Sequence, residues 1–161
     1  MSDGMPAVGS SAPDFTAPDQ DGNQVTLADQ LGKWTVIYFY PKDDTPGCTK
    51  EACDLRDNYG PIVEFGAEVI GVSGDSAASH TKFREKHSLP FPLLSDPDHT
   101  VAKAYGAWGL KQNYGKTYEG IIRSTFVVDP AGTIAKVWPR VKPEGHGKQV
   151  AEWLKAHSAS E

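Results

Sequence analysis

Apolar and polar positions along the 161 residues alternate in a way that predicts both strands and helices. Residues 34–40 are apolar nearly throughout, which is typical of a central strand covered on both faces. Residues 67–73 indicate a second buried strand. Residues 124–128 and 133–138 flank Asp129-Pro-Ala-Gly132, a strong hairpin signal. A sheet with a buried centre is therefore expected.

Helical spacing of apolar residues predicts helices around this sheet. A helix is expected from about Pro46 or Gly47 to Tyr59, and another after Asp75 or Ser76, either of which can cap it, as far as Lys86. Shorter segments and a last helix complete the pattern: a hairpin of residues 15–16 and 24–27, a strand at 91–94, and helices at 98–105 and 144–156. Residues 106–120 are rich in Gly, Lys and Tyr, which favours a surface loop.

This order of elements predicts a mixed α/β sheet with helices on both faces and a hairpin at the N-terminus. It is the order of a thioredoxin-like fold. The length fits a single domain of residues 1–161, and the first 11 residues are expected to be flexible because Gly, Ser and Pro are common there.

Composition removes several classes of function. The formal net charge is −5 and the 16 Lys and Arg residues are scattered, so no nucleic-acid surface is expected. The longest apolar run, residues 34–40, is much shorter than the roughly 20 residues that cross a bilayer, so no membrane insertion is expected. The N-terminus has neither a basic start nor an apolar core, so a cytoplasmic location is the default expectation.

The chain has two cysteines, which is too few for a disulfide-built scaffold and indicates chemistry instead. Cys48 falls in the first turn of the helix predicted to begin near Pro46. Free backbone N–H groups and the positive end of the helix dipole favour an anion there, so the thiolate of Cys48 is favoured. Thr45 can place a hydroxyl beside the sulfur or an incoming oxygen.

The spacing of Cys48 and Cys53 has a mechanical consequence. On an ideal helix the two lie about 140° apart, with Cα atoms roughly 8.7 Å from each other. A disulfide needs less than about 7 Å and converging side chains. Either the two thiols never pair, or pairing requires the first turns of the helix to unwind.

These residues resemble a known family. The pattern Pro41-x-x-x-Thr45-x-x-Cys48 is similar to the active-site signature of peroxiredoxins, and a second cysteine five positions later resembles the PrxQ branch, also called bacterioferritin comigratory protein. The resemblance extends along nearly the whole chain through shorter pieces: Ala12-Pro-Asp-Phe15, Tyr38-Phe-Tyr-Pro41, Gly71-Val-Ser73, Arg123-Ser-Thr-Phe126, Asp129-Pro-Ala-Gly132, Pro143 and His146.

The resemblance implies a thiol peroxidase that reduces hydrogen peroxide and organic hydroperoxides. In that reading Cys48 is the peroxidatic nucleophile, Thr45 orients the peroxide, and Arg123 stabilises the thiolate and the polarised O–O bond. Pro41 shields the sulfur from bulk water. Cys53 resolves the sulfenic acid as an intramolecular Cys48–Cys53 disulfide.

The same resemblance implies thioredoxin or a similar dithiol protein as reductant, and no metal, haem or flavin cofactor. A monomer is expected, because resolution within one helix needs no second subunit.

Other interpretations of the same residues stay open. Cysteines on helices are often inert, Thr45 could serve as a helix cap, and Glu51 either is a helix-start charge or orients Arg123. A zinc site would need the two cysteines with histidines, which lack paired close spacing: His80, His87, His99, His146 and His157. A disulfide reductase would carry Cys-x-x-Cys, and a non-catalytic holdase is possible on the same fold.

Overall fold

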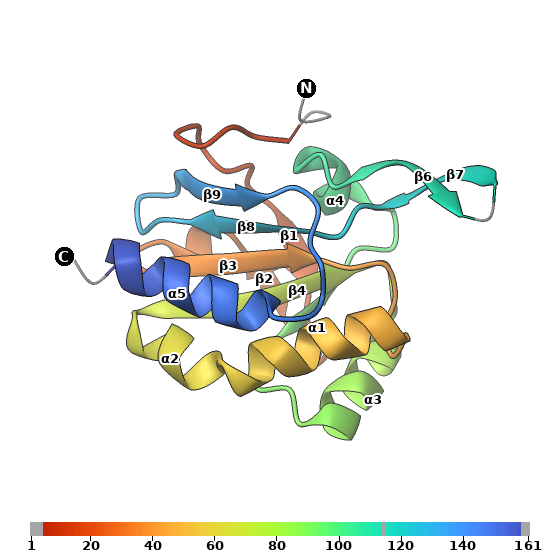
Figure 1. Cartoon of the computed structure of the whole chain (residues 1–161), viewed down its shortest axis with the longest axis horizontal. Coiled ribbons are helices and arrows are strands. Elements are labelled where there is room, and N and C mark those ends of the chain that lie inside the picture. The colour runs from red at the N-terminus through yellow and green to blue at the C-terminus, as the bar shows by residue number, and fades with distance from the viewer. Residues whose placement is uncertain (1–4, 114, 159–161) are drawn as a thin grey trace.

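The computed structural model describes residues 5–113 and 115–158 and places a five-stranded mixed sheet at the centre of that part of the chain (Figure 1). The strand order is β5-β4-β3-β8-β9. The bounds are β3 (Trp34–Phe39), β4 (Ala67–Ser73), β5 (Leu93–Ser95), β8 (Ser124–Val128) and β9 (Ile134–Trp138). β3 pairs parallel with β4 and antiparallel with β8, and all six of its residues are buried. The predicted central strand is confirmed.

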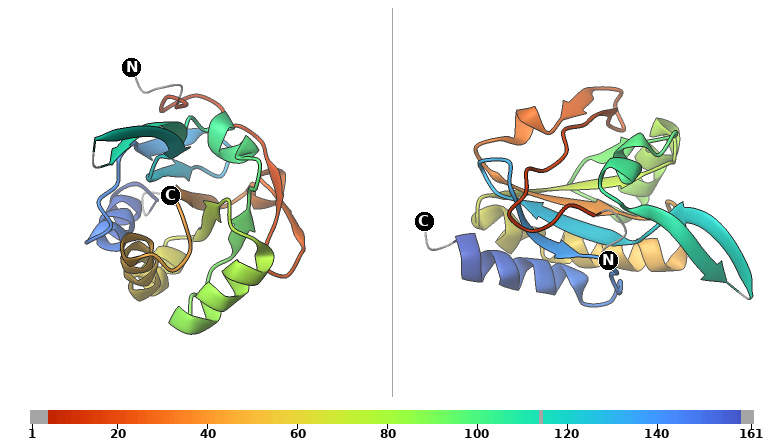
Figure 2. Two further views of the ribbon diagram at one scale, coloured as in Figure 1. Left: turned by 90° about the vertical axis from the view of Figure 1, so that its right-hand side faces the viewer. Right: turned by 90° about the horizontal axis from the view of Figure 1, so that it is seen from above.

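Helices cover both faces of this sheet, as expected, but unequally (Figure 2). One face packs against α1 (Pro46–Asp57), α2 (Tyr59–Glu64), α3 (Ala77–His87) and α5 (His146–Ser158). The other face carries α4 (Thr100–Ala104) and the N-terminal hairpin, made of β1 (Thr16–Pro18) and β2 (Gln24–Thr26) and followed by the short 3-10 helix η1 (Ala28–Gln30). Within the described ranges, no helix is long and apolar enough to cross a bilayer.

The side chains of β3 divide the core into two halves. Val36 and Tyr38 point toward the four-helix face, whereas Ile37 and Phe39 point toward α4 and the hairpin. Successive strand residues face opposite sides, so a continuous apolar run fills both halves. The parallel strands β3 and β4 end at the same edge of the sheet, and α1 begins near the end of β3 (Figure 1).

Residues 106–120 are not the predicted loop. They form an antiparallel hairpin of β6 (Trp108–Asn113) and β7 (Lys116–Ile121), which projects from the body of the molecule (Figure 1). Four residues of β7 are exposed, so the alternation of apolar and polar positions that normally reveals a strand is weak. Gly115 supplies the turn with a φ of +78°, a conformation that favours glycine.

The helix predicted for residues 46–59 ends earlier, and a separate helix follows it. Asn58 has a non-helical backbone, with φ −108° and ψ 8°, and divides α1 from α2. The unpredicted α2 contains Pro61, which is tolerated because it lies in the first turn, where its missing N–H would have had no helical partner.

The N-terminal segment predicted to be flexible makes backbone contacts in its described part, where residues 9–12 lie beside residues 132–134 at the start of β9. The N–H of Gly9 donates to the Ile134 carbonyl, the N–H of Ile134 donates to the Ser10 carbonyl, and Ser11 bridges Thr133. The edge strand offers unpaired backbone groups that this segment satisfies. Residues 1–4 lie outside the described residues.

Candidate active site

Cys48 is the third residue of α1 and is buried, with 2% of its surface exposed. The chain leaves β3, crosses a loop that includes Pro41, and enters the helix through Thr45, whose backbone is extended. Pro46 occupies the first helical position, where a missing N–H costs nothing. The sulfur therefore lies in the first turn, where N–H groups without helical acceptors favour a thiolate.

Arg123, in the connection between β7 and β8, hydrogen-bonds to the sulfur of Cys48. Its Nη2 donates to the Sγ of Cys48 at 3.3 Å, and its Nη1 donates to the Oε1 of Glu51 at 2.7 Å. The Arg123 carbonyl accepts from the N–H of Val141, which fixes the backbone behind the guanidinium. One guanidinium thus joins two groups of α1 that are 75 and 72 positions away in sequence.

Gly47 makes the close approach of this guanidinium possible. A Cβ at position 47 would lie 3.2 Å from Nη2 of Arg123, closer than an ordinary van der Waals contact. The glycine lies within α1 rather than in a turn. Its role is therefore to leave space above the first turn of the helix for the guanidinium of Arg123.

Glu51 is fully buried and faces Arg123, so it is more than a charge at a helix start. Its Oε2 has no hydrogen-bond partner among the residues that the structure describes. Burial raises the pKa of Glu51 from its ordinary 4.5 to about 7, although the charge and hydrogen bond of Arg123 oppose that rise. The carboxyl group therefore changes its charge near neutral pH, directly beside the guanidinium that contacts Cys48.

The Glu51→Gln variant is expected to remove a pH-dependent part of the stability. Between pH 4.5 and about 7 the native state keeps a proton on Glu51 that the unfolded chain has released, so native stability falls as the pH rises. At about 1.4 kcal/mol per pH unit the fall is about 3 kcal/mol. Urea unfolding of both proteins should show the wild type losing this advantage over the variant across that window, with no further change above it. A stability difference that stays constant from pH 4.5 to 8 contradicts this result.

The other residues of the predicted site lie nearby in different roles. Thr45 is half-buried, caps no helical N–H with its side chain, and donates its hydroxyl to the Lys42 carbonyl at 3.0 Å. Pro41 lines a cavity of about 210 Å³ together with Arg123. Cys53 is a half-buried free thiol further along α1, and Cys48 is free as well.

Next to Cys53, α1 is fastened to α5. The carboxylate of Asp54 accepts a hydrogen bond from the N–H of Gly147 in the first turn of α5. A Cβ on Gly147 would collide with the backbone carbonyl of Asp54, so the two helices meet at a point that admits no side chain. The part of α1 after Cys53 is therefore held against the body of the molecule.

The loop that carries Thr45 is anchored by Asp43, a residue that the sequence pattern does not single out. Its Oδ1 accepts from the Tyr40 hydroxyl at 2.5 Å, and its Oδ2 lies 2.7 Å from Nδ1 of His80 and accepts from the Ser79 hydroxyl at 2.8 Å. Nε2 of His80 lies 2.9 Å from the Leu94 carbonyl, which can only accept, so Nε2 carries a proton.

Two further contacts fix the same loop. The N–H of Asp43 donates to the Asp75 carboxylate at 2.7 Å. Asp44 has a φ of +59°, a strained conformation for a residue with a side chain, and its carboxylate pairs with Lys86 at 2.9 Å. The turn into Thr45 is therefore held from α3. The available sequence signal was a histidine on the buried face of α3, three residues before Phe83.

Asp43, Asp75 and His80 are close enough to hold a metal ion, but their atoms already hydrogen-bond to one another or to neighbouring groups. They are the candidate group of this kind among residues 5–113 and 115–158, and neither cysteine belongs to it.

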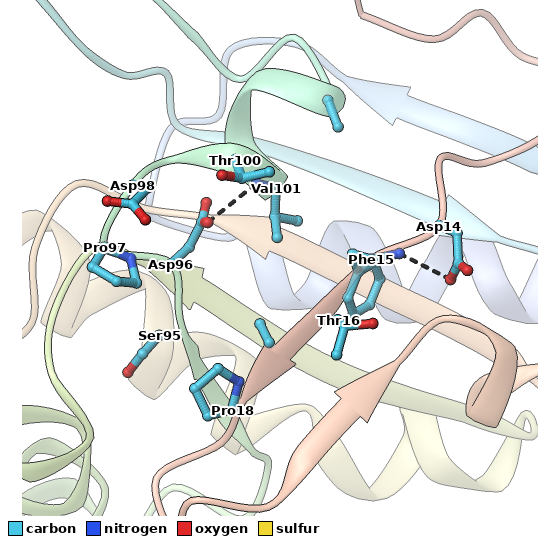
Figure 3. Close-up of a pocket in the computed structure, with 12 residues that line it drawn as sticks. Asp14, Phe15, Thr16, Pro18, Ser95, Asp96, Pro97, Asp98, Thr100 and Val101 are labelled. Atoms are coloured by element: carbon cyan, nitrogen blue, oxygen red, sulfur yellow. Dashed lines mark hydrogen bonds between the residues drawn. The ribbon is translucent and has the colours of Figure 1, made fainter.

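A second cavity, of about 280 Å³, lies beside β1 and α4 (Figure 3). Two of the three carboxylates that line it bind backbone groups: Asp96 accepts from the N–H groups of Val101 and Ala102, and Asp14 accepts from that of Phe15. None of the residues that line it belongs to the group around Cys48.

Comparisons with known proteins agree with this geometry. The AhpC/TSA family matches residues 8–137. The Peroxiredoxin Bcp of Bacillus subtilis is 49% identical over 148 residues, which cover 92% of this chain and 94% of that protein. The Peroxiredoxin Bcp of Escherichia coli is 47% identical over 150 residues, covering 93% and 96%.

Solved structures of peroxiredoxins also resemble this chain. Peroxiredoxin Q of Xanthomonas campestris superposes with a TM-score of 0.85 at 42% identity, over 89% of this chain and 91% of that one. A PrxQ mutant of Xylella fastidiosa gives a TM-score of 0.89 at 35% identity, over 94% and 97%. The thioredoxin-like fold is confirmed, and with it the interpretation of the cysteine signature as that of a peroxidase. The chain belongs to the AhpC/TSA family, and within it to the Bcp/PrxQ peroxiredoxins.

Proposed function

We propose that this peroxiredoxin reduces hydroperoxides through Cys48 and resolves the product with Cys53. The observation that carries the proposal is the environment of one sulfur. The Sγ of Cys48 lies in the first turn of α1 with the Nη2 of Arg123 at 3.3 Å, which stabilises the thiolate needed for attack.

The first step transfers one oxygen to the sulfur. The Cys48 thiolate attacks the terminal oxygen of the hydroperoxide, the O–O bond breaks, and Cys48 becomes a sulfenic acid. The leaving hydroxide or alkoxide takes up a proton and departs as water or an alcohol. Negative charge moves from the sulfur to the leaving oxygen, and the guanidinium of Arg123 is fixed in advance to stabilise it. The Thr45 hydroxyl, which donates to Lys42, keeps its lone pairs for a hydrogen bond from the peroxide.

The second step needs a change of structure. Cys48 and Cys53 both lie within the intact helix α1, where five-residue spacing keeps them apart. The first turns unwind, the sulfenic acid condenses with the thiol of Cys53, and an intramolecular disulfide forms with release of water. Asp54 and Gly147 mark where unwinding stops, since α1 is held to α5 there.

Thioredoxin or a similar dithiol protein then reduces the disulfide by thiol exchange. The enzyme acts as a monomer, because both redox partners lie in one chain, and we place it in the cytoplasm. The bacterioferritin comigratory protein of Xanthomonas campestris, whose structure has been solved, has alkyl peroxide reduction activity. We extend that substrate class, along with hydrogen peroxide, to this chain.

Intact-mass measurement after one equivalent of hydrogen peroxide tests this scheme. The reduced wild type should lose the two hydrogens of an internal disulfide, because both thiols belong to the same molecule. The Cys53→Ser variant should instead gain one oxygen and remain as a sulfenic acid. Disulfide-linked dimers of the wild type on a non-reducing gel, or normal recycling of Cys53→Ser by thioredoxin, would refute intramolecular resolution.

A further inference from the structure

Lys111, on β6 of the projecting hairpin, reaches the cavity in front of Arg123. The cavity, of about 210 Å³, is lined by Pro41, Lys111, Ile122, Arg123, Arg140 and Val141. The ammonium of Lys111 is held in place, because it donates to the Ile121 carbonyl at 2.9 Å, two residues before Arg123. The hairpin thus places an ammonium in the cavity that Arg123, the partner of Cys48, also lines.

The hairpin is shaped for this side chain. Lys111 pairs with Tyr118 in the β6–β7 register, and its aliphatic stem crosses Gly120 on the opposite strand. A Cβ at position 120 would lie 3.2 Å from Cδ of Lys111, so a glycine keeps the path of the stem clear. The side chain is half-buried rather than solvated like a surface lysine.

The surroundings also change the acidity of this ammonium. Burial lowers the pKa of Lys111 below its usual value, the positive charge of Arg123 lowers it further, and the charge of Cys48 acts in the opposite direction. Both Arg123 and Cys48 are thus close enough to influence it. An ammonium with a lowered pKa releases its proton more readily than a lysine in water.

We propose that Lys111 is the proton donor to the leaving oxygen when Cys48 attacks a hydroperoxide. This inference rests on the proposed function. The sulfur–oxygen bond forms as the O–O bond breaks, the leaving oxygen takes the electron pair of that bond, and the ammonium gives it a proton. Water or an alcohol departs, and the neutral amine regains a proton from solvent.

The residues around the cavity point to the same choice. A leaving hydroxide or alkoxide is strongly basic and needs a proton. The guanidinium groups of Arg123 and Arg140 stay protonated under all ordinary conditions, so they stabilise charge without donating. Pro41, Ile122 and Val141 have no titratable group. Lys111 is therefore the residue lining this cavity that can both approach the leaving oxygen and release a proton.

The experiment compares peroxides that differ in whether the leaving oxygen needs a proton. Hydrogen peroxide and tert-butyl hydroperoxide have strongly basic leaving groups, hydroxide and tert-butoxide. The leaving group of peracetic acid is acetate, which needs no proton at neutral pH. Single-turnover oxidation of Cys48 should slow about 100-fold in Lys111→Gln with the first two, in line with loss of a general acid. With peracetic acid the rate should fall by a few-fold at most. Lys111→Arg should lose as much as Lys111→Gln, because arginine keeps the charge but gives up no proton.

Lys116→Gln is the matched control, since Lys116 is exposed on the other strand of the same hairpin and does not line the cavity. Its rates should equal those of the wild type. Three outcomes would overturn the role of Lys111: unchanged rates in Lys111→Gln, an equal loss with all three peroxides, or wild-type rates in Lys111→Arg. A wild type that fails to react with any of them would instead overturn the proposed function itself.

Discussion

The Cys48→Ser variant is expected to lose all measurable peroxide reduction. Serine has nearly the same shape, so the helix and the contact with Arg123 should survive, but its hydroxyl stays protonated at neutral pH and is a poor nucleophile. The thiolate is the reacting species, and nothing else at the start of α1 can replace it. Consumption of hydrogen peroxide, followed with thioredoxin and its reductase, should fall to the level without enzyme.

The Cys53→Ser variant is the matched control for that loss. It changes the same atom type on the same helix, yet it should still consume one equivalent of peroxide, because Cys48 is intact. Continued turnover by Cys48→Ser would mean that another group does the chemistry, and the assignment of the nucleophile would be wrong.

The Arg123→Met variant is expected to slow oxidation of Cys48 by about 100- to 1,000-fold, the loss typical of removing one fixed donor from a site where charge develops. Methionine keeps much of the aliphatic bulk but cannot donate to Sγ or to Glu51. The variant should also be less stable to unfolding, because the buried carboxylate of Glu51 is then left without its partner. Stopped-flow oxidation and urea unfolding measure the two effects.

Combining Arg123→Met with Glu51→Gln separates these effects. Removing the unpaired carboxylate should restore much of the stability, because an amide costs less to bury than a charge. The oxidation rate should remain as low as in Arg123→Met. If the double variant regained the rate as well, Arg123 would act by supporting the fold and not through its contact with the sulfur.

Local patterns in the sequence were sufficient for the buried elements and for the position of Cys48 in the first turn of a helix. The apolar run of β3, the turn at Asp129 and the cysteine behind Pro46 each follow from interactions among neighbouring residues, so they can be read without the fold. The β6–β7 hairpin was missed for the opposite reason. Its strands pair with each other while most side chains of β7 face solvent, so burial leaves little pattern in the sequence.

Contacts between distant segments could not be predicted. Asp43 meets His80 across 37 positions, and Arg123 meets Glu51 across 72, so each pair depends on how strands and helices pack. The position of Gly47 under Arg123 and of Gly120 under Lys111 depends on packing in the same way. Only the family resemblance placed Arg123 in the site, and it left the role of Glu51 open.

The junction of Asp54 with Gly147 divides α1 into an opening segment and a fixed base. In the proposed mechanism the residues from Pro46 to Cys53 leave the helix, whereas Leu55, which is fully buried, stays packed against the sheet. The oxidised enzyme would therefore differ from the reduced one over about two helical turns at one end of the molecule. A reductant that docks at that end can distinguish spent enzyme from ready enzyme by shape alone, before any sulfur is exchanged.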